Sequence, residues 1–335
     1  MKFGLFEVES IGSTLEEWTD VGRRAEEAGF DAFFFGDNHG PQHHPSPEVK
    51  TTWGLSSAPM IQCMALAACT RRLRVGTNVV ALPLRNAIEV AKEATAIDVL
   101  SQGRMILGVG SGLEVNGFHD YGVEGIARFS LLEEGVEVMR RAWTEGRFSF
   151  AGKRYLLKKV KLNLLPVQQP GIPIWVAART KAGARRAARI GDALVTDCFT
   201  NLEETREFVS VYREICEKRG KKPYVVVMRS ICMGSSQEEI RRQFEGDILR
   251  RGREYSGIQW LKEIEQADDA SWERYVTDRV IQGTPEQCAQ ELERWQREVG
   301  IDYVIAEFPL AADGRKRMLE DVEVFGRDVI PRLSG

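Results

Sequence analysis

The chain has 335 residues, of which 43% are hydrophobic and 28% are charged, a composition typical of a globular protein with a sizeable core. Its 46 Lys and Arg residues are balanced by 49 Asp and Glu residues, and this net charge of −3 argues against a nucleic-acid partner, which requires a concentrated basic surface. The six cysteines are scattered without a C-x-x-C pair, and no signal peptide or run of 18 apolar residues is evident, so we expect a cytoplasmic protein without disulfides, a zinc site or a membrane span.

Short apolar runs typical of strands alternate along the chain with longer amphipathic runs typical of helices. The first unit is a strand at residues 2–8 and a helix at 15–28, which Gly29 ends. The second unit begins with the continuous apolar run 32–35, typical of a strand covered on both faces. The remaining strands are expected at 73–80, 104–109, 173–177, 192–196, 223–232 and 302–308, and the other helices at 57–70, 87–101, 181–190, 203–218, 236–251, 285–299 and 313–329.

Eight strand–helix units in one run predict an α/β fold with a parallel sheet. We expect the sheet to close into a (β/α)8 TIM barrel formed by residues 1–335 as a single domain, and an open doubly wound sheet is the alternative. Insertions interrupt the alternation at 37–56, 147–172 and 254–280, the second of which contains a predicted hairpin. Insertions that follow barrel strands lie at the carboxyl-terminal face, where active sites are built.

The run Asp37-Asn38-His39 directly follows the second predicted strand and therefore points toward that face. His39 is a candidate general base or hydrogen-bond donor, although a loop histidine bonded to the backbone explains the pattern equally well. His43 and His44 follow in the same loop, but their spacing matches no compact set of ligands, so we expect no metal.

Two strand tips consist of small residues. The third strand ends near Thr77 and Asn78, and glycines alternate at 108, 110 and 112 after the fourth. Such tips allow a planar ligand to approach the backbone, although the first is equally a strand with a polar end. The spacing G-x-G-x-G differs from the dinucleotide fingerprint G-x-G-x-x-G, and this difference excludes a Rossmann site.

The fifth strand runs directly into a helix through Arg179, Thr180 and Lys181. The free amides and positive dipole end of this helix, together with the two cations, predict a phosphate-binding site. In the alternative interpretation, Thr180 is only the N-cap of the helix.

Taken together, these segments resemble the bacterial luciferase-like flavin monooxygenases, and the resemblance covers nearly the whole chain. Its most specific part is the run from Asp98 to Gly112. The other matching segments are 25–31, 75–83, 87–93, 170–178, 283–286 and 329–331.

The resemblance implies a barrel, usually dimeric, that binds reduced FMN at the carboxyl ends of its strands. It assigns the phosphate to Arg179, Thr180 and Gly183, beside Ala177 and Ala178. The isoalloxazine ring is assigned to Thr77, Asn78, Gly110, Ser111, Gly112 and Leu113. A non-prolyl cis peptide is expected between Asn78 and Val79.

The chain departs from the luciferase pattern at two places. Where luciferases carry Glu-His-His, this chain has Asp37-Asn38-His39, so the catalytic role falls to Asn38 or His39. Gly110 occupies the position of the reactive cysteine of the luciferases, so light emission is not expected.

The resemblance therefore predicts a monooxygenase that uses O2 and reduced FMN, supplied by a separate reductase, on a small organic substrate, and that forms a homodimer. Two alternatives remain open at this point. One is a deazaflavin-dependent hydride-transfer oxidoreductase with the same fold, and the other is a non-catalytic flavin-binding partner in a heterodimer.

Overall fold

Eight parallel strands close into a barrel. The computed structural model describes residues 1–6, 15–37, 58–112, 118–124, 127–254 and 269–333. Around the barrel the strands follow in chain order, and the last pairs with the first: β1 (Lys2–Phe6), β2 (Ala32–Phe35), β3 (Arg74–Thr77), β5 (Met105–Gly110), β8 (Ile174–Ala177), β9 (Ala193–Thr196), β10 (Val225–Met233) and β12 (Tyr303–Glu307). The predicted (β/α)8 barrel is confirmed, and the open sheet is excluded.

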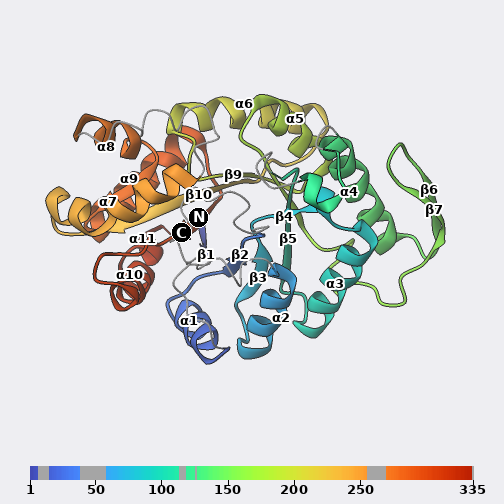
Figure 1. Ribbon diagram of the computed structural model, residues 1–335, viewed down its shortest axis with the longest axis horizontal. Helices are drawn as coiled ribbons and strands as arrows, with labels where there is room; N and C mark the ends of the chain where they lie inside the picture. The colour runs from blue at the N-terminus through green and yellow to red at the C-terminus, as the bar shows by residue number, and fades with distance from the viewer. Residues whose placement is uncertain (7–14, 38–57, 113–117, 125–126, 255–268, 334–335) are drawn as a thin grey trace.

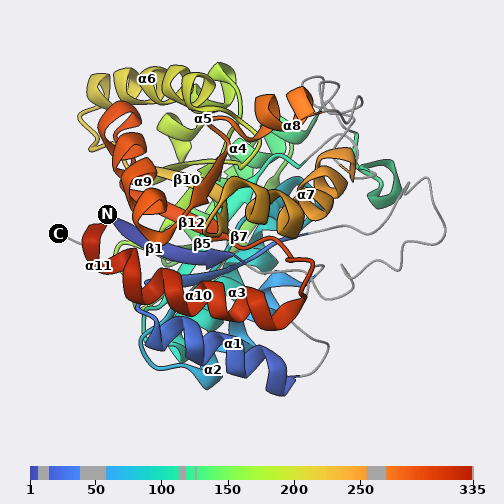
Figure 2. The ribbon, with the colours of Figure 1, turned by 90° about the vertical axis from the view of Figure 1, so that its left-hand side faces the viewer.

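Helices surround the strands in a ring (Figure 1). They are α1 (Leu15–Glu27), α2 (Pro59–Cys69), α3 (Ala87–Leu100), α4 (Arg128–Thr144), α5 (Lys181–Ile190), α6 (Leu202–Lys218), α7 (Gln237–Glu254), α8 (Asp269–Val276), α9 (Pro285–Val299), α10 (Arg315–Asp328) and α11 (Ile330–Leu333). The two ends of the described chain lie together (Figure 2). The Met1 ammonium donates a hydrogen bond to the Leu333 carbonyl at 2.9 Å.

Three elements differ from the sequence predictions. The expected strand 73–80 is divided into β3 and the two-residue strand β4 (Val80–Ala81), which pairs with β5. Helix α4 was not predicted, although its buried residues have helical spacing, among them Leu132, Val136, Met139 and Trp143. The stretch 254–280 contains α8 and leads into the short strand β11 (Val280–Gly283), which pairs with β10, and residues 255–268 lie outside the described part.

The predicted hairpin is present as β6 (Phe148–Ala151) and β7 (Leu156–Val160). Figure 1 shows it projecting beyond α4, on the outside of the ring.

An aromatic layer fills the barrel interior. The Trp175 ring stacks on Phe34 at a centroid distance of 5.4 Å and contacts Tyr303 at 5.1 Å. Glycines make room for it, because a Cβ at Gly4 or Gly76 would lie 2.5 or 2.6 Å from the Phe34 ring. Tyr303 donates to Asp31, which precedes β2, so the layer closes the amino-terminal side of the barrel and leaves the carboxyl-terminal side for a site.

Strands β3 and β5 approach each other so closely at Gly108 that no side chain fits. A Cβ at Gly108 would lie 1.9 Å from the Thr77 carbonyl oxygen. We expect Gly108→Ala to lower the free energy of unfolding by about 3 kcal/mol or more, because the obstacle is backbone, which cannot rotate away.

Urea denaturation measures this loss, with Gly146→Ala as the control, because a Cβ at Gly146 meets nothing within 4 Å. Equal stability of the two variants would show that the strands can separate at no cost.

Candidate functional site

The tips of β3, β5 and β8 form a wall with few side chains. A Cβ at Gly110 would lie 2.8 Å from the Val79 side chain and 3.7 Å from the Ala177 Cβ, so these three tips are in contact. The peptide between Asn78 and Val79 is cis, as expected. A wall with few side chains suits the flat face of a ligand ring, since such a face can approach the backbone closely.

The two residues at the tip of β3 are held by neighbouring strands. The buried Thr77 hydroxyl donates to the Gly108 carbonyl at 2.7 Å. The Asn78 backbone amide donates to the Phe35 carbonyl at 2.8 Å, and its side-chain Nδ2 lies 3.3 Å from the Met228 sulfur on β10. Asn78 therefore reaches across the barrel mouth from β3 to β10.

Beyond β5 the chain turns at Gly112, whose φ is +71°. A Cβ at Gly112 would lie 2.7 Å from the Phe118 ring of the short 3₁₀ helix η3 (Phe118–Tyr121). Ser111 and Gly112 are half-buried and continue the wall past Gly110. Leu113 lies outside the described residues, and so do Asn38 and His39, so their assigned roles remain predictions.

The amino terminus of α5 adjoins the wall. The Thr180 hydroxyl accepts from the Gly183 amide at 3.0 Å and is therefore the N-cap. The amides of Lys181 and Ala182 come first in the helix and have no carbonyl within it to bond, so the cap leaves two donors for an anion. A Cβ at Gly183 would lie 2.8 Å from the Ala178 Cβ, which places the first turn against the end of β8.

Carboxylates accompany the cations of this helix end. Arg179 forms an ion pair with Asp197 at 2.9 Å, and Lys181 forms one with Glu207 at 2.9 Å. The positive potential of this helix end therefore comes mainly from the amides and the helix dipole.

Arg229 supports Asp197 from behind the barrel wall. Its guanidinium is fully buried, donates to the carbonyls of Asp197 and Met228 at 2.6 Å each, and lies 3.9 Å from the Trp295 ring centroid. Burial lowers the pKa of the Arg229 guanidinium to about 10, so the group stays charged at neutral pH. These bonds fix the position at which Asp197 meets Arg179.

Asp37 has a structural role at the tip of β2. Its buried carboxylate accepts from Arg85 Nη2 at 2.6 Å, from Arg85 Nε at 3.1 Å and from the Ala81 amide at 2.9 Å. These bonds tie β2 to the segment after β4. Among the residues that the structure describes, no cluster of three His, Cys, Asp or Glu side chains is suited to a metal ion.

A buried pair of polar residues, Ser230 and Glu307, was missed by the sequence analysis. The Ser230 hydroxyl donates to Glu307 Oε2 at 2.9 Å, and the two residues are partners in the register of β10 and β12. A signal was available, because Glu307 is the single charged residue in the apolar run 303–308.

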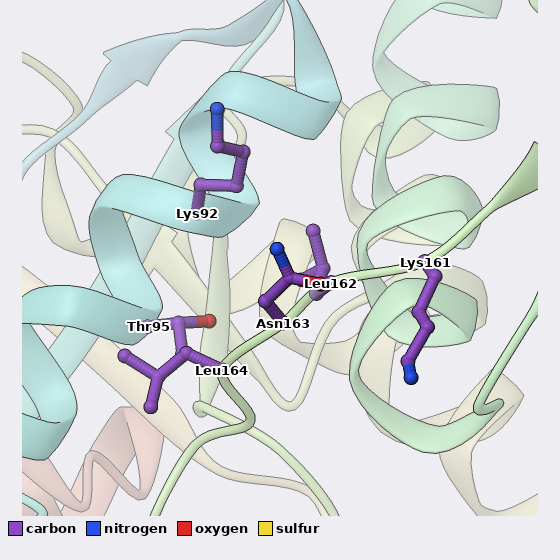
Figure 3. A pocket seen from close by; sticks show the side chains of 6 residues that line it. All are labelled: Lys92, Thr95, Lys161, Leu162, Asn163 and Leu164. Atoms are coloured by element: carbon purple, nitrogen blue, oxygen red, sulfur yellow. The ribbon is translucent and has the colours of Figure 1, made fainter.

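A separate cavity of about 240 Å³ lies outside the barrel, between α3 and residues 161–164 (Figure 3). Its polar side chains on α3 already have partners. Lys92 binds Glu89, and the Thr95 hydroxyl donates to the Ala91 carbonyl and accepts from Trp143. This cavity therefore contributes nothing to the site at the strand ends.

Comparison with known proteins assigns the family. The sequence model of the luciferase-like monooxygenases matches residues 1–303. This chain belongs to the luciferase-like monooxygenase family. Within the part that the structure describes, no helix is long and apolar enough to cross a membrane.

Proteins similar to this chain include both a dehydrogenase and monooxygenases. The chain is 26% identical over 337 residues to the F420-dependent glucose-6-phosphate dehydrogenase of Nocardia farcinica, covering 95% of this chain and 94% of that protein. It is 23% identical over 364 residues to the alkanal monooxygenase alpha chain of Photorhabdus laumondii, covering 100% and 98%. The crystal structure of monooxygenase RslO1 from Streptomyces bottropensis has the same fold, with a TM-score of 0.82, 23% identity and coverage of 99% and 100%.

The ion pair at the tip of β2 can be tested by removing its cation. We expect Arg85→Met to lower the free energy of unfolding by about 3–5 kcal/mol, because the Asp37 carboxylate is then buried without its cation. Denaturant titration measures the loss, and the double variant Asp37→Asn/Arg85→Met should regain part of it. A loss below about 1 kcal/mol in Arg85→Met would contradict this role for the pair.

Proposed function

We propose that this protein is a flavin-dependent monooxygenase that uses reduced FMN and O2 on a small organic substrate. One observation carries the proposal. Gly110 and Ala177 place the side-chain-poor wall directly beside Ala178, on which the amino-terminal turn of α5 packs at Gly183. A ring seat and an anion seat are thus joined through two consecutive residues, as a molecule with a flat ring and a terminal phosphate requires.

In this proposal the amides of Lys181 and Ala182 bind the phosphate, and Gly110 and Ala177 lie against the ring. Thr77, Asn78, Ser111, Gly112 and Leu113 complete the ring seat. When bound, reduced FMN supplies the electrons that activate O2. The chain orients the ring, and Asn38 or His39 provides a hydrogen-bonding group near the substrate.

The charges around α5 favour FMN over the deazaflavin F420, whose tail carries further carboxylates beyond its phosphate. Arg179 and Lys181 already pair with Asp197 and Glu207, so this helix end suits one dianionic group better than a chain of anions. The deazaflavin alternative, hydride transfer without O2, is favoured by the 26% identity to the F420-dependent dehydrogenase. A non-catalytic flavin-binding partner is the third candidate.

Anaerobic titration with reduced FMN, followed by exposure to O2, tests the proposal. We expect reduced FMN to bind and its reoxidation, followed by absorbance, to be slower than that of free reduced FMN, because the site restricts access of water. Failure to bind reduced FMN would reject the proposal, and binding of reduced F420 without any effect of O2 would select the hydride-transfer alternative. In this proposal a separate reductase delivers the FMN, and the protein is a homodimer.

The phosphate assignment predicts a specific effect of Thr180→Asp. Aspartate caps a helix as well as threonine, so the stability should be unchanged, while its charge should weaken FMN binding by about 10- to 100-fold. Fluorescence titration measures the affinity, with Thr180→Ser as the uncharged control.

Riboflavin provides the second control for Thr180→Asp, because it has the same ring and no phosphate. Its affinity should be the same in wild type and Thr180→Asp. An equal loss for FMN and riboflavin would place the effect at the ring, and an unchanged FMN affinity would remove the phosphate from this helix.

A further inference from the structure

Three polar side chains lie near the carboxyl ends of neighbouring strands, and we call them the polar corner: Ser230 on β10, Gln282 on β11 and Glu307 on β12. Strand alternation places all three on the interior face. On β12, Tyr303 and Ile305 belong to the cluster around Phe34 and Trp175, so Glu307 follows on the same face of the strand. By the same alternation, Ser230 follows Met228 on β10, and Gln282 follows Val280 on β11. Strand β10 lies between the other two strands, because Ser230 pairs in register with Glu307 and Cys232 pairs with Gln282, which is therefore two residues farther along than Ser230.

The polar corner begins where the side-chain-poor wall ends. Asn78 at the tip of β3 contacts Met228, which is two residues before Ser230 on the same face of β10. Ser230 and Glu307 therefore lie one layer farther toward the mouth than that contact. If a ligand ring lies on β3, β5 and β8, the Glu307 carboxylate lies near the edge of the ring that faces β10.

The polar corner retains unused hydrogen-bonding capacity. Gln282 Oε1 is buried and has no hydrogen-bond partner among the described residues. Buried polar atoms are nearly always paired, so an unpaired one in a barrel mouth marks a place where a ligand or water binds.

We propose that Glu307, oriented by Ser230 and assisted by Gln282, is an acid–base residue of this site, facing the ring of the bound cofactor and the substrate. This inference rests on the proposed function. Its carboxylate accepts one proton, from solvent or from a substrate hydroxyl, and the resulting acid returns that proton to a substrate oxygen. The same carboxyl group therefore accepts the proton and gives it back.

The strands beside Glu307 carry other ionisable groups, and the contacts of several of these groups are known. On β9, Asp197 is paired with Arg179, and β10 contributes the buried Cys232 thiol beyond Ser230. Before β11, Arg279 donates to the Phe199 carbonyl, and the neighbouring strand β1 presents Phe6. A like charge nearby disfavours the ionised form of a carboxyl group, so negative charge placed on the ring favours protonation of Glu307.

Proton uptake on cofactor binding tests the inference without the unknown substrate. Calorimetric titration in buffers of different ionisation enthalpy counts the protons taken up when reduced or oxidised FMN binds between pH 6 and 8. Reduced and oxidised FMN carry the same phosphate, so the difference between their proton counts reports the effect of charge on the ring. We expect this difference to fall by up to about one proton per protein in Glu307→Gln relative to wild type, because one carboxyl is lost.

Two variants make the result specific. Glu307→Asp keeps a carboxylate and should retain the uptake, and Glu320→Gln removes an exposed carboxylate on α10 and should match wild type. Equal proton counts in wild type and Glu307→Gln, with reduced FMN bound in both, would overturn the role of Glu307 alone. If neither protein binds reduced FMN, the proposed function fails and this inference fails with it.

Discussion

The close approach of β3 and β5 is the constraint on which the rest of the site depends. At Gly108 the two backbones leave no room even for a Cβ, and at Gly110 a Cβ would enter the Val79 side chain. The glycines bring the strand tips together, and the Asn78 side chain, at the end of β3, then reaches Met228 on the far side of the mouth. The ring seat and its junction with the polar corner follow from this contact between backbones.

Charge in the site is distributed in pairs. Arg85 neutralises Asp37 at the tip of β2, Arg179 binds Asp197 beside the amino terminus of α5, and Arg229 holds the Asp197 backbone from outside the barrel. Because these carboxylates have partners, the helix amides remain the main attraction for an anion. The paired side chains thus hold the strand and helix ends in place, and the backbone amides remain available to an anion.

The sequence predicted the fold well because most barrel strands are apolar on both faces and helices such as α1, α5 and α9 are strongly amphipathic. The division of β3 and β4 was missed, since the expected cis peptide at Asn78 was not translated into an interruption of the strand. Thr180 was predicted as part of a phosphate-binding site, with a role only as the N-cap as the alternative. Its bond to Gly183 shows that it is the cap, and the phosphate assignment stays a prediction. Ion pairs such as Asp37–Arg85 join residues 48 positions apart, and no local pattern reports such a distance.

The two sides of the mouth differ in what substitution can change. On β3, β5 and β8 the surface is made of main chain, so a replacement at Gly108 or Gly110 disturbs the barrel before it alters selectivity. On β10, β11 and β12 the surface is made of side chains, which can be exchanged while the strands stay in register. Descendants of such a barrel can therefore keep the main-chain side unchanged and diversify their side chains on the opposite side.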